Sequence, residues 1–261
     1  MRLTGLGHAV FAATLIAIGF WGLAGGGFAA IWEGAPKALP AREALAYACA
    51  LVSLASGAGL LWRRTAAPAA RLLLAWLLIW FLLFKAPLIW RAPLVEISWE
   101  DPAETLVILA AAWALYASAA ADWDRRRLGF ASGDGGLRIA RVLYGLAMIP
   151  FGLAHLFYVK QTAALVPGWL PAHTAWAWFT GGAYIAAGVA ILTAVLARLG
   201  AALSTLQMGL FTLLVWAPIL ADGSKSPSDW SEGVISWALT AAGWVIADTY
   251  SGSSWLAFRR R

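Results

Sequence analysis

The second half of this chain repeats short stretches of the first half at a spacing close to 131 residues. Three of the five prolines in the second half fall on a first-half proline at this spacing, where composition alone gives roughly 0.2 such matches. The matched stretches include Leu39-Pro40-Ala41 with Leu170-Pro171-Ala172, Ala86-Pro87 with Ala217-Pro218, Gly57 with Gly188, and Trp99 with Trp230. The sequence therefore predicts a tandem duplication, in which both halves adopt the same fold.

The composition is that of a membrane protein, because 62% of the residues are hydrophobic and only 12% are charged. The 17 tryptophans fit this class, since the indole ring favours the boundary between lipid and water. The net charge of +6 does not indicate nucleic-acid binding, because the basic residues lie in short loops between apolar segments. A single cysteine, Cys49, excludes an internal disulfide, a CxxC redox pair and a cysteine-ligated metal cluster.

Eight apolar segments are each close to the ~20 residues that cross a ~30 Å hydrocarbon core. Four segments in each half give both halves the same orientation in the membrane, as in parallel repeats. We therefore predict an all-α polytopic membrane protein with eight transmembrane helices, arranged as two four-helix bundles over 1–120 and 138–261 and joined by a charged, glycine-rich cytoplasmic linker at 121–137. The segments are 9–31, 43–62, 71–90, 103–120, 139–158, 173–195, 199–220 and 233–250.

Lysine and arginine predict the orientation, since they concentrate on the cytoplasmic side of membrane proteins. With the N-terminus inside, 13 of the 19 basic residues fall on the cytoplasmic side. Both termini are thus expected in the cytoplasm, and the expected location is the inner (plasma) membrane of a bacterial-type cell. The 13 residues are Arg2, Arg63, Arg64, Arg71, Arg125, Arg126, Arg127, Arg138, Arg141, Arg198, Arg259, Arg260 and Arg261.

The most distinctive local pattern lies in the second half. The residues from Phe151 to Tyr158 read FGLAHLFY, those from Leu165 to Pro171 read LVPGWLP, and a Thr180-Gly181 pair follows. A histidine near the outer end of a helix, a proline-punctuated connection and a TG-containing helix resemble the DoxX-like membrane family. The resemblance covers 148–192, and the duplication extends it to a diverged second copy in the first half.

The resemblance implies a four-helix bundle and, for some members of that family, a role in quinone-linked or membrane oxidoreductase systems. Two positions depart from the family pattern. Tyr184 stands where many members have an acidic residue, four positions after Thr180, and His155 aligns with Gly25 in the first half. Only one half can therefore use the histidine.

His155 is the leading candidate for a ligand contact. It lies 14 residues beyond Arg141, which is ~21 Å along a helix, and polar groups at such depth usually face a bundle interior or a wet cavity. It either donates a hydrogen bond to a quinone carbonyl or relays protons, or it bonds a neighbouring backbone carbonyl and fixes helix packing. Tyr158, Tyr184 and Trp216 are further candidates for lining such a pocket.

Lys85 is the second candidate, at a similar expected depth just before Pro87. It either pairs with an outer carboxylate such as Glu96 or Glu104, lines a polar cavity, or extends to the lipid headgroups. Its counterpart in the second half is Trp216, so the two halves differ at this matched position too.

Three functions agree with these features. The first is an accessory or quinone- or lipid-pocket subunit of membrane redox metabolism, whose partners are the lipid bilayer and a membrane oxidoreductase. The second is a small-solute or lipid permease with a path between the two bundles, and the third is a non-catalytic assembly factor. No catalytic set, metal site or nucleic-acid interface is predicted, no cofactor other than a quinone is expected, and whether the protein is an enzyme is left open.

Overall fold

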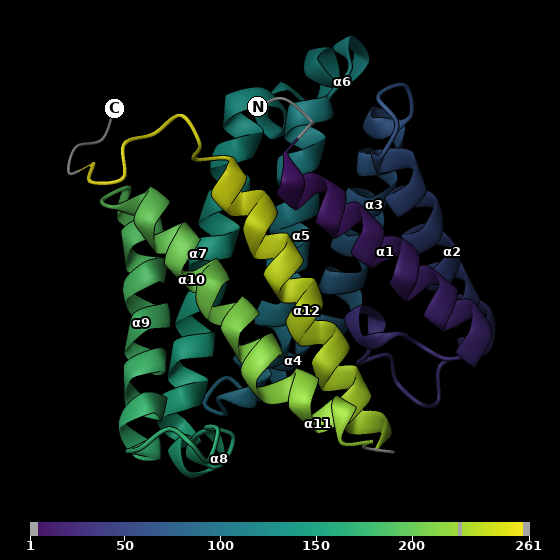
Figure 1. Cartoon of the computed structure of the whole chain (residues 1–261). Coiled ribbons are helices and arrows are strands. Elements are labelled where there is room, and N and C mark those ends of the chain that lie inside the picture. The colour runs from purple at the N-terminus through teal and green to yellow at the C-terminus, as the bar shows by residue number, and fades with distance from the viewer. Residues whose placement is uncertain (1–4, 224–225, 258–261) are drawn as a thin grey trace.

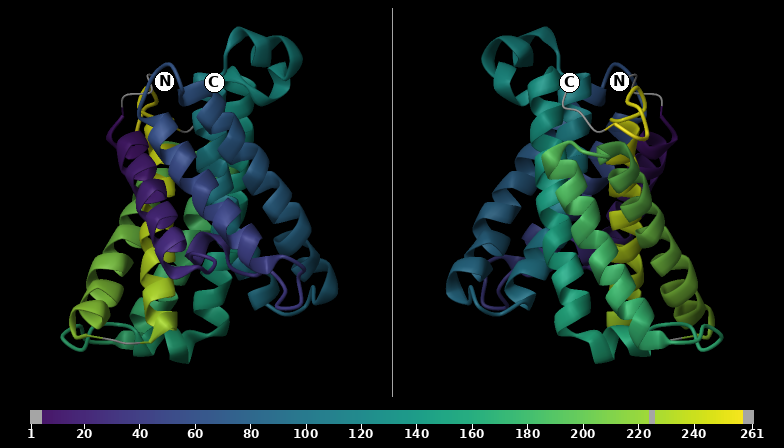
Figure 2. Two further views of the ribbon diagram at one scale, coloured as in Figure 1. Left: turned by 90° about the vertical axis from the view of Figure 1, so that its right-hand side faces the viewer. Right: turned by 90° about the vertical axis from the view of Figure 1, so that its left-hand side faces the viewer.

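The computed structural model describes residues 5–223 and 226–257, which form helices joined by turns and loops and contain no strand. Long helices run side by side between two ends of the molecule (Figure 1). The first and last described residues lie at the same end, which we call the proximal end, and the opposite end is the distal end (Figure 2). Of the residues used above to assign orientation, Arg2 and Arg259 to Arg261, together with Lys225, lie outside the described residues.

The first half contains four long helical stretches, the third of which is interrupted by a π-helical turn. Its elements are α1 (Leu6–Gly25), the 3-10 turn η1 (Ala30–Trp32), α2 (Arg42–Leu60), α3 (Ala66–Trp80), the π turn η2 (Phe81–Lys85), α4 (Ala86–Arg91) and α5 (Ile97–Ala119).

The second half has the same order of long stretches, with a π turn in its third. After α6 (Asp122–Arg127) and the 3-10 turn η3 (Gly129–Ala131) it consists of α7 (Gly133–Phe157), α8 (Val159–Ala164), α9 (His173–Thr193), α10 (Ala197–Phe211), the π turn η4 (Thr212–Trp216), α11 (Ala217–Ala221) and α12 (Pro227–Asp248). The segment 121–137, expected to be a flexible linker, is largely helical, since it contains α6, η3 and the first turn of α7.

Seven helices in the described part of the chain are long and apolar enough to cross a membrane. They correspond to the first seven predicted segments, and the protein is therefore a polytopic helical membrane protein. The remaining predicted segment corresponds to α12, which has 22 residues but carries Asp229, Glu232 and Asp248 and is not among the seven.

The two π turns lie at the 131-residue spacing and have a common local cause. A proline ring clashes with the carbonyl four residues earlier, so a helix widens or bends ahead of it. Pro87 follows η2 and Pro218 follows η4 in the same way. Ala41 (φ 52°) and Ala172 (φ 58°), which precede α2 and α9, also share a left-handed backbone conformation at this spacing.

The helices of the two halves interleave around a central pair. Within each half, consecutive helices contact one another, but α7 also packs along α5, α1 packs along α12, and α5 contacts α12. In Figure 1, α5 and α12 lie between α9 and α10 on one side and α1 and α2 on the other. The last helix of each half thus packs against the first long helix of the other half.

Helices α7 and α9 approach each other closely at glycines, which have no side chain to hold the backbones apart. A Cβ on Gly152 would lie 2.5 Å from the carbonyl oxygen of Gly181, and a Cβ on Gly188 would lie 2.7 Å from that of Gly145. The small residues of α9 thus form a helix–helix contact at Gly181 and Gly188, whereas Gly182 faces open space.

Candidate functional site

A cavity of about 210 Å³ opens in the distal half of the second-half helices. Side chains from α5, α7, α8, α9, α10, η4 and α12 form its wall. Its polar and aromatic lining residues are Glu100, Glu104, Phe151, His155, Tyr158, Thr162, Tyr184, Phe211, Trp216, Glu232 and Ser236. Four residues singled out from the sequence, His155, Tyr158, Tyr184 and Trp216, therefore face one space.

His155 has one ring nitrogen fixed by the backbone. Its Nδ1 lies 2.8 Å from the carbonyl oxygen of Phe151, which can only accept a hydrogen bond. Nδ1 must then carry the proton, and in the neutral ring Nε2 is left as an acceptor. The imidazole therefore bonds a backbone carbonyl of its own helix, one of the two alternatives expected for it, and also lines the cavity, while a quinone contact or a proton relay stays a prediction.

Aromatic rings form a continuous part of the wall. The ring centroids of His155 and Tyr184 are 5.4 Å apart, and those of Phe151 and Tyr184 are 6.0 Å apart. Phe211 and Trp216 meet edge to face at 6.3 Å on the α10–η4 side. Tyr184 is buried at 6% exposure, because its ring fills the space between α7 and the cavity.

Three carboxylates complete the polar part of the cavity. Glu100 and Glu104 are four residues apart on α5 and so share one helix face, and Glu232 reaches the cavity from α12. Glu104 and Glu100 are half-buried, while Glu232 is exposed and marks the side on which the cavity opens. Among the described residues, the ion pairs are Arg71–Asp124 and Lys85–Asp101, so neither involves these three glutamates.

Lys85 lines a second cavity of about 400 Å³ on the other side of α5. It is only 3% exposed and does not extend to the headgroups; its Nζ lies 2.6 Å from Oδ1 of Asp101. Glu100, Glu104 and Glu232 line this cavity as well as the first. The two cavities therefore adjoin across the α5–α12 pair, with Lys85 in one and His155 in the other.

The acidic residues of the site were not singled out from the sequence as ligand contacts. Their signal was present, since Glu100 and Glu104 stand one turn apart at the start of an otherwise apolar helix. A carboxylate pair on one helix face inside a membrane protein marks a polar interior.

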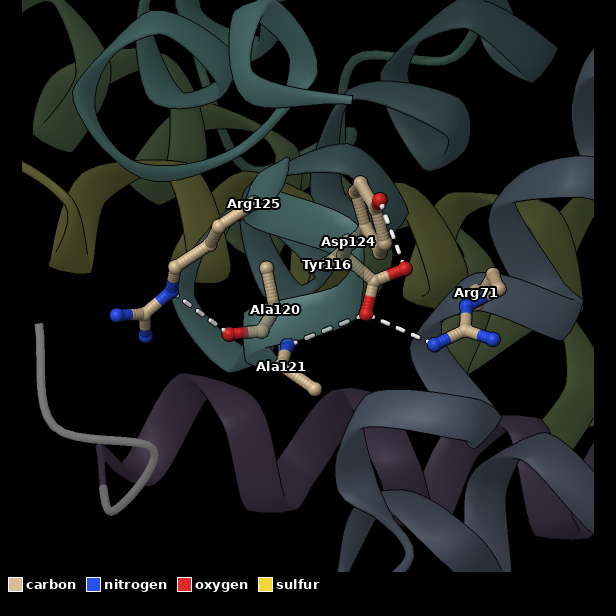
Figure 3. Close-up of polar contacts among 6 residues, drawn as sticks. All are labelled: Arg71, Tyr116, Ala120, Ala121, Asp124 and Arg125. Atoms are coloured by element: carbon tan, nitrogen blue, oxygen red, sulfur yellow. Dashed lines mark hydrogen bonds and ion pairs between the residues drawn. The ribbon is translucent and has the colours of Figure 1, made fainter. Parts of the chain in front are cut away.

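A separate polar cluster lies near the proximal end, on α6 (Figure 3). Asp124 is fully buried and accepts hydrogen bonds from Arg71 (2.8 Å), Tyr116 (3.2 Å) and the backbone N–H of Ala121 (3.1 Å). Burial acts to raise the pKa of Asp124, but these donors, Arg71 foremost, outweigh it and hold that pKa below its usual range. The arrangement ties α6 to α3 and α5.

Glu96, just before α5, is the second acidic group with an altered pKa outside the long helices. Neither of its buried carboxylate oxygens has a hydrogen-bond partner. Burial raises the pKa of Glu96 to about 7. It lies close enough to Glu100 to add to the negative charge at the distal end.

Within residues 5–223 and 226–257, no three histidine, cysteine, aspartate or glutamate side chains come together as metal ligands. None of the protein-family models matches the chain, and no curated protein and no solved structure shows significant similarity to it. The geometry of the cavity thus carries the functional argument.

Proposed function

We propose that the protein is a membrane-embedded binding protein of the pocket type, whose second half holds a small amphiphilic ligand in the cavity beside His155. The observation that carries the proposal is the convergence of Tyr184, His155 and Glu104, from three different helices, on one partly apolar space. Sites for small ligands usually have this composition, with apolar and aromatic walls and a few polar groups that fix orientation.

The proximal side of the cavity is closed, which supports binding over passage. Met208 lines the cavity, and beneath it the hydroxyl of the fully buried Tyr144 lies 3.0 Å from Ser204 Oγ. In α5, Ala110, Ala111 and Ala112 are likewise fully buried. A ligand that enters from the distal side meets close-packed residues rather than a channel.

A quinone is the narrower form of this proposal, in keeping with an accessory role in membrane redox metabolism. Quinone carbonyl oxygens need donors, and the neutral His155 offers an acceptor at Nε2. The hydroxyls of Tyr158 and Tyr184, or a protonated His155, would have to supply them.

Occupancy of the cavity tests the proposal. The protein is extracted by an amphipathic polymer into nanodiscs that keep the surrounding lipid, and bound molecules are identified by native mass spectrometry. Ala154→Phe places a ring into the cavity from a lining position that is 5% exposed, while Leu213→Phe makes the same kind of change at an exposed position. We expect a bound molecule in the wild type and in Leu213→Phe that is absent from Ala154→Phe. Equal occupancy in all three, or none in the wild type, contradicts the proposal.

A permease is the second candidate, favoured by the way the two cavities adjoin across α5 and α12. Transport requires the closed proximal half to open. In a Cys49→Ser background, a permease predicts that Ala111→Cys reacts with a water-soluble maleimide, as a Ser231→Cys control at the distal side does. A binding pocket predicts reaction at Ser231→Cys alone.

We further propose that the chain is a tandem duplication of a DoxX-like four-helix unit with eight spans, α12 being the eighth. The π turns and the left-handed alanines at the 131-residue spacing support the duplication. The basic residues near the proximal end support a cytoplasmic proximal side in a bacterial-type inner membrane. A reporter enzyme active only outside the cytoplasm, fused after residue 257, is expected to be inactive, and an active fusion would reverse the orientation.

A further inference from the structure

The first half of the molecule already holds an ammonium group against one of its carboxylates. Lys85, at the end of the π turn η2, places Nζ 2.6 Å from Asp101 on α5. The backbone makes room for it at Gly34 (φ 99°), where a Cβ would come within 3.0 Å of the Lys85 Nζ. The cation is thus part of the architecture at this position.

The second half retains the carboxylate and lacks the cation. At the 131-residue spacing, Glu232 on α12 matches Asp101, and Trp216 at the end of the π turn η4 matches Lys85. Both Glu232 and Trp216 line the cavity beside His155. Where the first half supplies its own ammonium group, the second half has an open space walled by an indole ring.

The chemistry of that space is complementary to a cation. Its polar groups from α5 and α7 are acceptors, namely the carboxylates of Glu100 and Glu104 and the Nε2 of neutral His155. Three carboxylates line the cavity and, among the described residues, no lysine or arginine does, and charges withdrawn from water are costly without a partner of opposite sign. The Lys85 ammonium group in the adjoining cavity is already paired with Asp101. The aromatic faces of Trp216, Tyr184 and Phe211 attract cations through their ring quadrupoles.

We propose that the ligand of this cavity is an organic ammonium ion, whose nitrogen takes against Glu232 the position that Lys85 takes against Asp101. The proposal rests on the proposed function, since it names the class of ligand bound at the same site. Carboxylates bind the N–H groups through charge-assisted hydrogen bonds, and the apolar part of the ligand rests on Phe151 and Leu239. The group can come from a free amine or from the headgroup of an aminolipid.

The experiment compares benzylamine with benzyl alcohol, which has the same ring but no charge. Binding to the full-length protein in lipid nanodiscs made of phosphatidylglycerol is measured by isothermal titration calorimetry. We expect benzylamine to bind at least about tenfold more tightly than the alcohol, because a hydrogen bond to a charged group is lost with the amine. Glu232→Gln is expected to weaken benzylamine by about the same factor and to leave the alcohol unchanged.

A pair of variants at Trp216 separates charge from shape. Trp216→Lys places a lysine where the first half has Lys85, so the protein's own ammonium group occupies the space and benzylamine binding is lost. Trp216→Met, with a chain of similar length and no charge, retains measurable binding. Equal loss in both variants overturns the assignment, because it shows that only the indole volume matters.

The source of the amine follows from a second nanodisc composition. If phosphatidylethanolamine lowers the apparent affinity for benzylamine relative to phosphatidylglycerol, the headgroup is the ligand; if it does not, a free amine is the ligand.

Failure of this inference differs from failure of the proposed function. Equal binding of amine and alcohol, both lost in Ala154→Phe, overturns the ammonium assignment and leaves the pocket, whereas no binding of either probe and no occupant of the cavity overturns both.

Discussion

The Asp124 carboxylate of α6, in the segment between the two halves, lies 2.8 Å from the Arg71 guanidinium of α3. Asp124 is fully buried, whereas 42% of the Arg71 side chain is exposed, where it stacks 4.9 Å above the Trp123 ring. Arg125, next in sequence, donates to the carbonyl oxygen of Ala120. The segment between the two halves is thereby attached to the first half, and its geometry sets where α7 begins.

Asp124→Asn is expected to lower the free energy of unfolding by about 1–3 kcal/mol, because a buried acceptor for three donors loses its charge. The measurement is the thermal unfolding midpoint of the purified protein in detergent. Asp122→Asn is the matched control, since Asp122 is an exposed carboxylate on the same short helix, and it should have little effect. Equal effects of the two substitutions would show that the buried network does not stabilise the fold.

The contribution of Asp124 should depend on pH in a defined direction. Its pKa is lowered in the folded protein, so its stabilising effect is present above the unfolded-state pKa of about 3.9 and is lost as pH falls through the folded value. The stability difference between wild type and Asp124→Asn should be constant above about pH 5 and shrink below about pH 4. A difference that persists undiminished at the acid end counts against the ion pair as its source.

Glu96 should act in the opposite sense. Its folded-state pKa is raised from 4.5 to about 7, so folding favours the protonated carboxyl, and stability is expected to fall as pH rises between these values. Glu96→Gln should remove this part of the pH dependence and raise stability at pH 8. Glu43→Gln, at an exposed carboxylate, should leave the profile unchanged. A wild-type profile that Glu96→Gln does not alter would falsify the assignment.

Gly152→Ala should destabilise the protein by about 1–3 kcal/mol, since overpacking at a close helix contact forces the helices apart. A Cβ there would lie 2.5 Å from the Gly181 carbonyl oxygen. A Cβ added at Gly182, on the partner helix α9, meets nothing within 4 Å, so Gly182→Ala should be neutral or slightly stabilising. Thermal midpoints of the two variants, measured side by side, check the contrast, which disappears if α7 and α9 do not pack as described.

Asp101→Asn should cost about 3 kcal/mol, because it leaves the Lys85 ammonium group buried without its partner. The double variant Asp101→Asn with Lys85→Met should recover most of the loss, since no buried charge then remains. Chemical denaturation of the single and double variants gives the coupling between the two positions. Additive losses would mean that the two side chains do not interact in the folded protein.

The sequence allowed the approximate bounds of the long helices to be predicted, but it placed the starts of α5, α7 and α12 several residues too late. The segment predicted at 103–120 is helical from Ile97. The predicted start was too late because Glu100, Asp101 and Glu104 interrupt the apolar pattern, although these side chains line a cavity inside the molecule. A run of apolar residues predicts the part of a helix that contacts lipid, but it does not predict the part that lines a polar cavity.

The glycines at 133–136 were misread for a different reason. Glycine clusters favour loops, yet these residues form the first turn of α7. At Gly136 a Cβ would lie 2.1 Å from the Ala131 carbonyl oxygen, so glycine is required there by a close backbone approach rather than for flexibility. The same Cβ would lie 2.7 Å from the Ala117 Cβ of α5, and this tertiary contact is not visible in any local pattern.

The site was predicted in part. His155, Tyr158, Tyr184 and Trp216 face one cavity, while Lys85 lies across α5 in the neighbouring one. That separation follows from the contacts of α5 with both α7 and α12, and hydropathy does not say which helices become neighbours. The difference between the halves at Lys85 and Trp216, by contrast, was visible in the sequence.

The seam between α1 and α12 also bears on how the chain is made. Trp237 Nε1 donates to Thr14 Oγ1, and Asp248 accepts from the backbone N–H of Gly7, so α1 is completed by a helix that is synthesised much later. At typical rates of synthesis, the 223 residues from Thr14 to Trp237 take on the order of 10–40 s. During that interval the Thr14 hydroxyl can still donate to the Val10 carbonyl oxygen of its own helix, while the side of α1 around it lacks its partner helix. A chain that ends before α12 therefore leaves α1 without the contacts that Trp237 and Asp248 make with it.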